Sequence, residues 1–161
     1  MNIFKALFGG RKRHTDDTET DGGDIERLRR DGLAALEQGQ AALAVQNLMR
    51  VVEAAPADTG SRYSLGMAYE ALGDLAHAYD ELQTVAQARP GEVEVLLRIA
   101  SVAGRMHSYT AMGEWCEKAL LADSSNARVY DMYAQACQAL GDATNAEAMA
   151  TRARMLANGE K

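Results

Sequence analysis

The residues of this chain that could do chemistry are few and scattered. The three histidines, His14, His77 and His107, share no spacing at which a metal site places its ligands. The two cysteines, Cys116 and Cys137, cannot supply a zinc site or a disulfide framework alone. No serine, histidine and acid arrangement and no glycine-rich phosphate loop is visible. The sequence therefore predicts a protein that is not an enzyme and that holds no metal and no cofactor.

Docking chemistry is concentrated in the N-terminal segment MNIFKALFGGRKR. On a helical wheel its large apolar side chains share one face, and a basic run follows a pair of glycines. The candidates for membrane or partner docking are Ile3, Phe4, Leu7, Phe8, Arg11, Lys12 and Arg13. Three interpretations stay open: weak peripheral docking on a membrane or partner, docking in a groove of this or a neighbouring copy, and incidental hydrophobicity. The apolar run is too short for a signal peptide.

Charge divides the chain into three zones. Residues 1–14 carry a formal charge of +4, residues 15–24 carry −5, and the remaining residues carry −5, which gives the net charge of −6. The acidic zone has no apolar residue and two adjacent glycines, so it is predicted to be a disordered linker. It lacks the alternation and closing glutamate of a calcium-binding loop. A net negative charge argues against general nucleic-acid binding.

Composition favours an all-α protein. Alanine, the best helix former, supplies 30 of the 161 residues, whereas proline supplies 2 and aromatic residues 6%. No apolar run approaches the roughly 18 residues that a membrane span requires. With two cysteines and no secretory signal, the cytoplasm is the predicted compartment.

The body of the chain repeats with a period of 34 residues. That shift aligns six columns, among them the turn column Gly39, Gly73, His107 and Gly141. Four units follow, at residues 25–58, 59–92, 93–126 and 127–158, with a short tail at 159–161.

Each unit is predicted to form two helices. In the second unit a turn at Gly73 separates them and Pro90 ends the second one, while Gly66 and Ala78 let the pair approach closely. The expected fold is an α-solenoid of four antiparallel helix pairs with a flexible N-terminal tail.

Over residues 25–158 the sequence resembles the tetratricopeptide repeat family. The residues that match the family pattern are Leu65, Gly66, Tyr69, Ala78, Leu82 and Pro90. Arg62 departs from it, since it stands where the family often has tryptophan. The resemblance implies a right-handed superhelix whose first helices line a concave groove, and with the composition it points to a bacterial protein.

In this family the groove binds a peptide or a partner protein. The groove-facing residues that the resemblance implies are Arg29, Leu33, Leu36, Tyr63, Met67, Glu70, Leu97, Ser101, Arg105, Asp131, Gln135 and Gln138. The clamp with which some members grip the acidic C-termini of chaperones is not present, because Leu33, Ser64 and Glu94 occupy positions that it needs.

The third unit departs most from the repeat. His107 replaces the turn glycine, Met112 replaces a small alanine, and Gly104 and Gly113 are additional. We expect that the glycines make room for Met112; the alternatives are a splayed helix pair and a functional hinge. Trp115, on the second helix of this unit, is either packed against Tyr109 or a neighbouring helix or exposed as a contact residue.

Core positions are predicted for both cysteines, where a thiol behaves as a small hydrophobe. The sequence thus predicts a protein-interaction scaffold or adaptor, cytoplasmic or held at the inner membrane by its N-terminal peptide. The alternative is a chaperone-like protein that shields an apolar client segment. Self-association is a further expectation, because Ala-rich faces on the last helix are left partly uncovered.

Overall fold

The computed structural model describes residues 22–159, over which the chain forms eight α-helices and no strand. The predicted N-terminal peptide lies outside the described residues, as do most of the predicted linker and the last two residues. The helices are α1 (Gly22–Glu37), α2 (Ala41–Ala54), α3 (Thr59–Leu72), α4 (Leu75–Ala88), α5 (Val93–Arg105), α6 (Tyr109–Ala122), α7 (Ala127–Ala139) and α8 (Ala143–Ala157).

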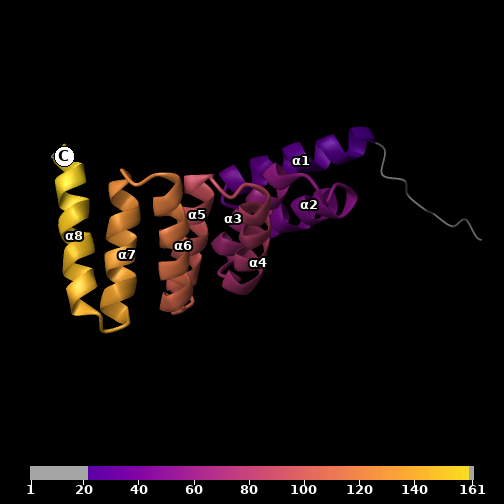
Figure 1. Cartoon of the computed structure of the whole chain (residues 1–161). Coiled ribbons are helices and arrows are strands. Elements are labelled where there is room, and N and C mark those ends of the chain that lie inside the picture. The colour runs from indigo at the N-terminus through magenta and orange to yellow at the C-terminus, as the bar shows by residue number, and fades with distance from the viewer. Residues whose placement is uncertain (1–21, 160–161) are drawn as a thin grey trace, which may run out of the picture.

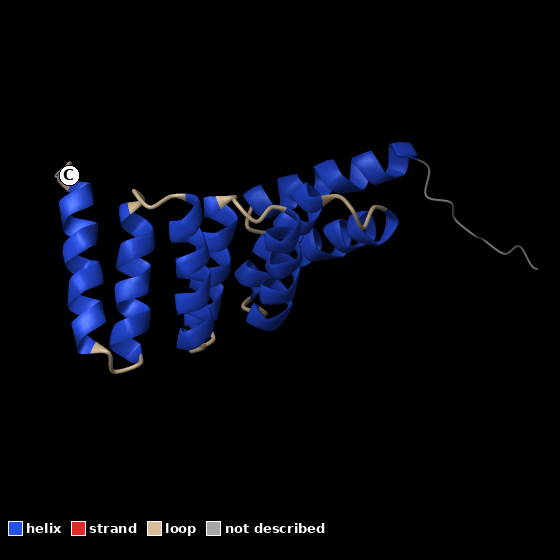
Figure 2. Cartoon of the chain, viewed as in Figure 1, coloured by secondary structure: helices blue, strands red, loops and turns tan. Residues whose placement is uncertain are grey.

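The eight helices stack as four antiparallel pairs, from α1 at one end to α8 at the other (Figure 1). Short loops join consecutive helices (Figure 2). Each helix packs on its neighbours in sequence, and the first helices of adjacent pairs also touch, α1 with α3 and α5 with α7. The predicted all-α solenoid of four helix pairs is confirmed.

Helix starts are fixed by polar side chains that accept hydrogen bonds from backbone amides of the first turn. Asp58, Asp74, Asn126 and Asp142 cap α3, α4, α7 and α8 in this way. Helix α1 begins at Gly22, so the last three residues of the predicted linker are helical. The acid Asp24 in its first turn suits the positive end of the helix dipole.

The turns inside each pair need a left-handed backbone. Gly39, Gly73 and Gly141 have φ values of +71°, +80° and +82°, as their shared column predicts. His107, which replaces glycine in the third pair, adopts the same conformation with φ of +59°. A side chain at that φ is strained, so this turn costs stability that the others do not.

Close approach within a pair depends on a glycine. A Cβ at Gly66 would lie 3.0 Å from Leu82 Cγ, and one at Gly32 would lie 2.8 Å from Leu48 Cγ. Both leucines are fully buried. The small residues therefore let a large aliphatic side chain of the second helix reach the backbone of the first.

In the third unit the glycine serves a different side chain. A Cβ at Gly104 would lie 2.9 Å from Met112 Sδ, and Met112 is buried. Gly104 therefore makes room for the large residue that replaces alanine. Gly113 does not share this role, because its Cβ would only make an ordinary contact with Tyr133.

The buried side chains of residues 22–159 form two clusters. The larger joins 17 residues of α4 to α7, among them Leu82, Leu96, Ile99 and Val129. The smaller joins six residues of α1, α2 and α3, namely Ala35, Ala44, Leu48, Val52, Leu65 and Ala68. Most of the apolar core therefore lies in the last three pairs.

Candidate functional site

Two adjoining hollows open beside the first helices of the last three pairs. One is lined by Glu70 of α3, by Glu94, Leu97, Arg98 and Ser101 of α5, and by Arg128 and Met132 of α7. The other is lined by Ser101, Gly104 and Arg105 of α5, by Tyr109 and Met112 of α6, and by Met132 and Gln135 of α7. Ser101 and Met132 belong to both. We call the surface that these two hollows form the groove.

Five of the predicted groove residues line it: Glu70, Leu97, Ser101, Arg105 and Gln135. Leu97 is only 2% exposed and forms part of the floor. The others lie outside both hollows, and they are Arg29, Leu33, Leu36, Tyr63, Met67, Asp131 and Gln138.

A polar network fixes the side chains at one end of the groove. The Glu70 carboxylate accepts hydrogen bonds from Arg98 Nη1 at 3.0 Å and from Arg105 Nη1 at 2.8 Å. Arg98 Nε also donates to the Tyr63 hydroxyl at 2.9 Å, and its guanidinium lies over the Tyr63 ring. Tyr63 therefore lies outside both hollows and holds the Arg98 side chain in position.

The arginine in this network stays charged. Burial disfavours the charged form of Arg98, but its hydrogen bonds with Tyr63 and Glu70 outweigh burial and raise its pKa. One carboxylate is thus shared by two guanidinium groups, which leaves a net positive charge beside Arg105. The nearby pair of Arg128 and Glu94 is balanced, with Nη1 and Oε1 3.1 Å apart.

Several groove residues were missed from the sequence. Arg128 and Met132 fall at repeat positions that were not among the predicted groove positions, and Tyr109 and Met112 come from a second helix. One signal did point to this place: Gly104 and Met112 both break the repeat pattern, and they meet at the same hollow.

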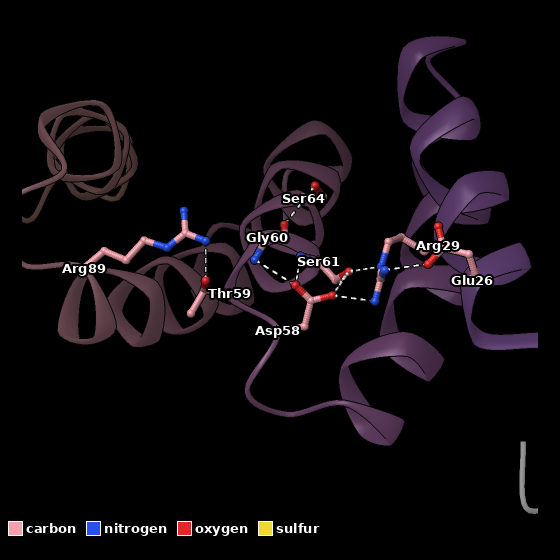
Figure 3. Close-up of polar contacts among 8 residues, drawn as sticks. All are labelled: Glu26, Arg29, Asp58, Thr59, Gly60, Ser61, Ser64 and Arg89. Carbon is pink, nitrogen blue, oxygen red and sulfur yellow. Dashed lines mark hydrogen bonds and ion pairs between the residues drawn. The ribbon is translucent and has the colours of Figure 1, made fainter. Parts of the chain in front are cut away.

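At the other end of the molecule the predicted groove residue Arg29 is held in an ion pair. Its Nη2 lies 2.8 Å from Asp58 Oδ2, and its Nε donates to Ser61 Oγ at 3.1 Å (Figure 3). Ser61 Oγ in turn donates to Asp58, which caps α3 through the amides of Gly60 and Ser61. The network joins α1 to the start of α3.

The two cysteines are buried side chains on α6 and α7. Burial raises the pKa of the Cys116 thiol to about 12, and it also raises the pKa of Cys137. Both are therefore protonated near neutral pH, and a protonated thiol is a poor nucleophile. This fits their predicted place in the core.

Two histidines fall within the described residues. His77 Nδ1 lies 2.7 Å from Asp74 Oδ2 and its ring stacks on Tyr69, while His107 Nδ1 lies 3.0 Å from the Tyr109 hydroxyl. Between residues 22 and 159 no three histidine, cysteine or acidic side chains gather as a metal site would require. None of the eight helices combines the length and the apolar character needed to cross a bilayer.

Trp115 packs against a neighbouring helix. It is 6% exposed, and its Nε1 donates to the Tyr79 hydroxyl of α4 at 2.8 Å. The Lys118 ammonium lies 3.7 Å from the centre of the ring. Of the alternatives drawn from the sequence, the structure shows packing on a neighbouring helix.

Comparison with known proteins gives a repeat family and a fold. A family model of the tetratricopeptide repeat matches residues 59–92, the second unit. A crystal structure of MamA superposes with a TM-score of 0.80 at 19% sequence identity, covering 86% of this chain and 81% of that chain. The MamA structure designated AMB-1 gives a TM-score of 0.80 at 20% identity, covering 86% of this chain and 75% of its own.

A third structure, MamA designated MSR-1, gives a TM-score of 0.79 at 20% identity and covers 88% of this chain and 81% of that chain. No curated protein sequence matches this chain. These TM-scores show that the fold is shared, and identities of this size show nothing beyond the fold.

Proposed function

Because the chain carries a tetratricopeptide repeat and folds as a tetratricopeptide-repeat solenoid, we propose that it is a non-catalytic scaffold that binds a peptide or a partner protein in the groove. The observation that carries this proposal is the pair of adjoining hollows along α3, α5 and α7. An extended concave surface formed by stacked repeats is suited to an extended ligand.

The groove is prepared for binding before a ligand arrives. Glu70, Arg98, Arg105 and Tyr63 hold one another in place, so these side chains lose little conformational freedom on binding. Ordering a long side chain at an interface costs about 0.5–1.5 kcal/mol, and a preformed network has already met that cost.

A photocrosslinking experiment tests the proposal. Benzoylphenylalanine placed at Gln135, which is exposed and lines the groove, is expected to crosslink a partner in cells. The matched control is the same substitution at Thr84, an exposed position on the second helix α4. Equal crosslinking yields at the two positions would contradict groove binding.

Two methionines favour the second candidate function, a chaperone-like protein that shields an apolar client segment. Met112 and Met132 both line the groove, and thioether side chains adapt to apolar surfaces of different shape. A scaffold is expected to bind one partner sequence, whereas a shielding protein binds many unrelated apolar peptides. Affinity measurements on such a set of peptides separate the two functions.

We further propose that residues 1–14 place this scaffold at the cytoplasmic face of the inner membrane. The support is the sequence of that segment, in which four large apolar side chains precede three basic ones. Each basic residue near anionic lipid adds about 1 kcal/mol of attraction. In liposome flotation the full chain is expected in the lipid fraction, and a chain without residues 1–14 is not. Equal recovery of both would refute the tether.

Self-association completes the proposed function. An apolar hollow between α7 and α8, lined in part by Met132, Ala150, Ala153 and Ala157, supports it. Sedimentation velocity over a range of concentrations is expected to show a species larger than the monomer. A single monomeric species at every concentration would exclude it.

A further inference from the structure

Three of the four residues that break the repeat pattern in the third unit lie at one hollow of the groove, and the fourth, Gly113, lies outside it. Gly104 lies at its floor, Met112 and Tyr109 form one side, and His107 bonds to the Tyr109 hydroxyl. Departures from the repeat pattern at three such positions would be scattered if each only adjusted local packing. Here they change the shape of a single concave site.

Because Gly104 has no side chain, Met112 can extend over its backbone at this hollow. The equivalent positions in the other units carry the side chains of Leu36, Glu70 and Gln138. Met112, whose equivalents are alanines, fills only part of the space, and a cavity of about 390 Å³ remains. That volume lies within the range of known ligand-binding pockets.

The walls of the hollow are apolar and its rim is positive. Met112 of α6 and Met132 of α7 both line it, and so does Arg105, whose side chain is 45% exposed. Because Glu70 is shared between Arg98 and Arg105, the negative charge there does not balance the two guanidinium groups.

The acid of α7 does not cancel this charge. In the repeat alignment Asp131 falls eight residues before the position of Arg105. Eight helical residues span about 12 Å, so Asp131 lies toward the opposite end of the helices. The end of the groove that holds the apolar hollow therefore favours a negatively charged group.

We propose that this hollow binds one aliphatic side chain of an extended peptide and that Arg105 pairs with a carboxylate next to it. The inference rests on the proposed function, since it names the chemistry of the ligand that the groove takes. A guanidinium presents a planar fork of donors that matches a carboxylate, and methionine walls accommodate leucine, isoleucine or methionine alike.

An oriented peptide array tests the inference with the full chain. Each pool fixes one central residue and its neighbour and randomises the rest. Pools with leucine, isoleucine or methionine beside aspartate or glutamate are expected to bind at least about tenfold more protein than pools with alanine or lysine at the centre. The reason is that the free energy of binding becomes more favourable with each methylene group that is buried. Equal binding by all pools would overturn the inference.

Two glycine variants separate the hollow from general effects on the fold. Gly104→Ala puts a methyl group at the floor, where it meets the movable end of Met112, and Gly113→Ala puts one against Tyr133 outside the hollow. Both replace a helical glycine by a better helix former. Gly104→Ala is expected to lower the signal of the aliphatic pools at least about fivefold, whereas Gly113→Ala leaves it unchanged. An equal change of the signal in the two variants would refute the binding of an aliphatic side chain in this hollow.

The carboxylate is tested separately with Arg105→Gln. This variant is expected to lose the preference for an acidic neighbour while it keeps the preference for an aliphatic centre. Retention of the acidic preference would refute the role of Arg105. If no pool binds the wild-type chain and crosslinking at Gln135 also fails, the proposed function falls with the inference. If crosslinking at Gln135 succeeds but no pool shows the preference, the inference alone falls.

Discussion

The junction between the first two helix pairs is built differently from the two junctions that follow. At the equivalent position of α3, α5 and α7 stand Ser61, Val95 and Val129, all buried. Ser61 belongs to the network of Arg29 and Asp58, whereas both valines belong to the large apolar cluster. The first junction thus combines a polar network with the small apolar cluster, whereas the two junctions that follow lie within the large apolar cluster.

The difference predicts two kinds of stability in one solenoid. In a stacked array each pair contacts only its neighbours, so the strength of each junction decides where the array opens first. Partly exposed ion pairs contribute about 0–1 kcal/mol each, whereas a fully buried aliphatic side chain contributes about 1.5–3 kcal/mol. Because the first junction has the smaller apolar cluster, the first pair should separate before the groove-bearing pairs unfold.

The largest effect is expected from a cavity in the apolar junctions. Ile99→Ala removes a fully buried side chain of α5 and should lower the free energy of unfolding by about 3 kcal/mol. Urea unfolding followed by the fluorescence of Trp115, the single tryptophan, measures this change. Leu121→Ala is the control, because Leu121 is 90% exposed and its loss should have almost no effect. Similar losses in both variants would remove the basis of the comparison.

The next effect concerns the polar junction. Asp58→Ala removes the cap of α3 and leaves Arg29 and Ser61 without their shared acceptor, so we expect a loss of about 2 kcal/mol. Asp58→Asn keeps an acceptor for the cap and loses only the charge, so its loss should stay below about 1 kcal/mol. Hydrogen exchange should show faster opening of α1 than of α7 in the alanine variant. Equal acceleration in both helices would contradict the separation of the junctions.

A smaller effect, an increase in the free energy of unfolding, is expected at the turn of the third pair. His107→Gly removes the strain of a side chain on a left-handed backbone and should stabilise the chain by about 1 kcal/mol. The reverse change Gly73→His should destabilise the second pair by a similar amount. Urea unfolding read by Trp115 measures both. If His107→Gly lowered the midpoint, the strain at this turn would be outweighed by the contact between His107 and Tyr109.

The sequence predicts those parts of the molecule that depend on contacts within one repeat. Gly66 and Leu82 meet because their positions in the two helices of a pair are fixed by the turn at Gly73. The repeat columns therefore give the helix pairs, their turns and most of the core. The same logic located the meeting of Gly104 and Met112.

Contacts made by long polar side chains could not be predicted in the same way. Arg62 replaces the usual tryptophan and forms an ion pair with Glu81 of α4, with Nη1 and Oε2 2.6 Å apart. The pairing of Arg29 with Asp58 joins α1 to the residue that caps α3. Such contacts depend on the angle between helices and on rotamers, which a one-dimensional repeat does not specify. Among the groove residues, Glu94, Arg98 and Arg128 were missed for this reason.

The smallest expected effect is an acid-dependent opening of the first junction. Burial opposes the ionisation of Asp58, but hydrogen bonds from Ser61 and the charge of Arg29 outweigh it, so the pKa of Asp58 lies below its ordinary value of 3.8. A carboxyl whose pKa is lowered by folding stabilises the folded state above that ordinary value. Its contribution is lost as the pH falls through the lowered pKa.

Acid titration of two signals tests this opening. Far-ultraviolet circular dichroism reports all helices, whereas Trp115 reports the apolar junction between the second and third pairs. Hydrogen bonds also lower the pKa values of three other acids, Asp74, Asp123 and Asp142. The donors are His77, Ser125 and Asn145, so each of these acids stabilises a helix end or a turn within its own unit. As the pH falls below about 4, helix signal should therefore be lost before Trp115 fluorescence changes. Asp58→Asn, whose amide does not titrate, should remove the acid dependence of that early loss. Coincident transitions in the wild-type chain would show that the first junction is as stable as the two that follow.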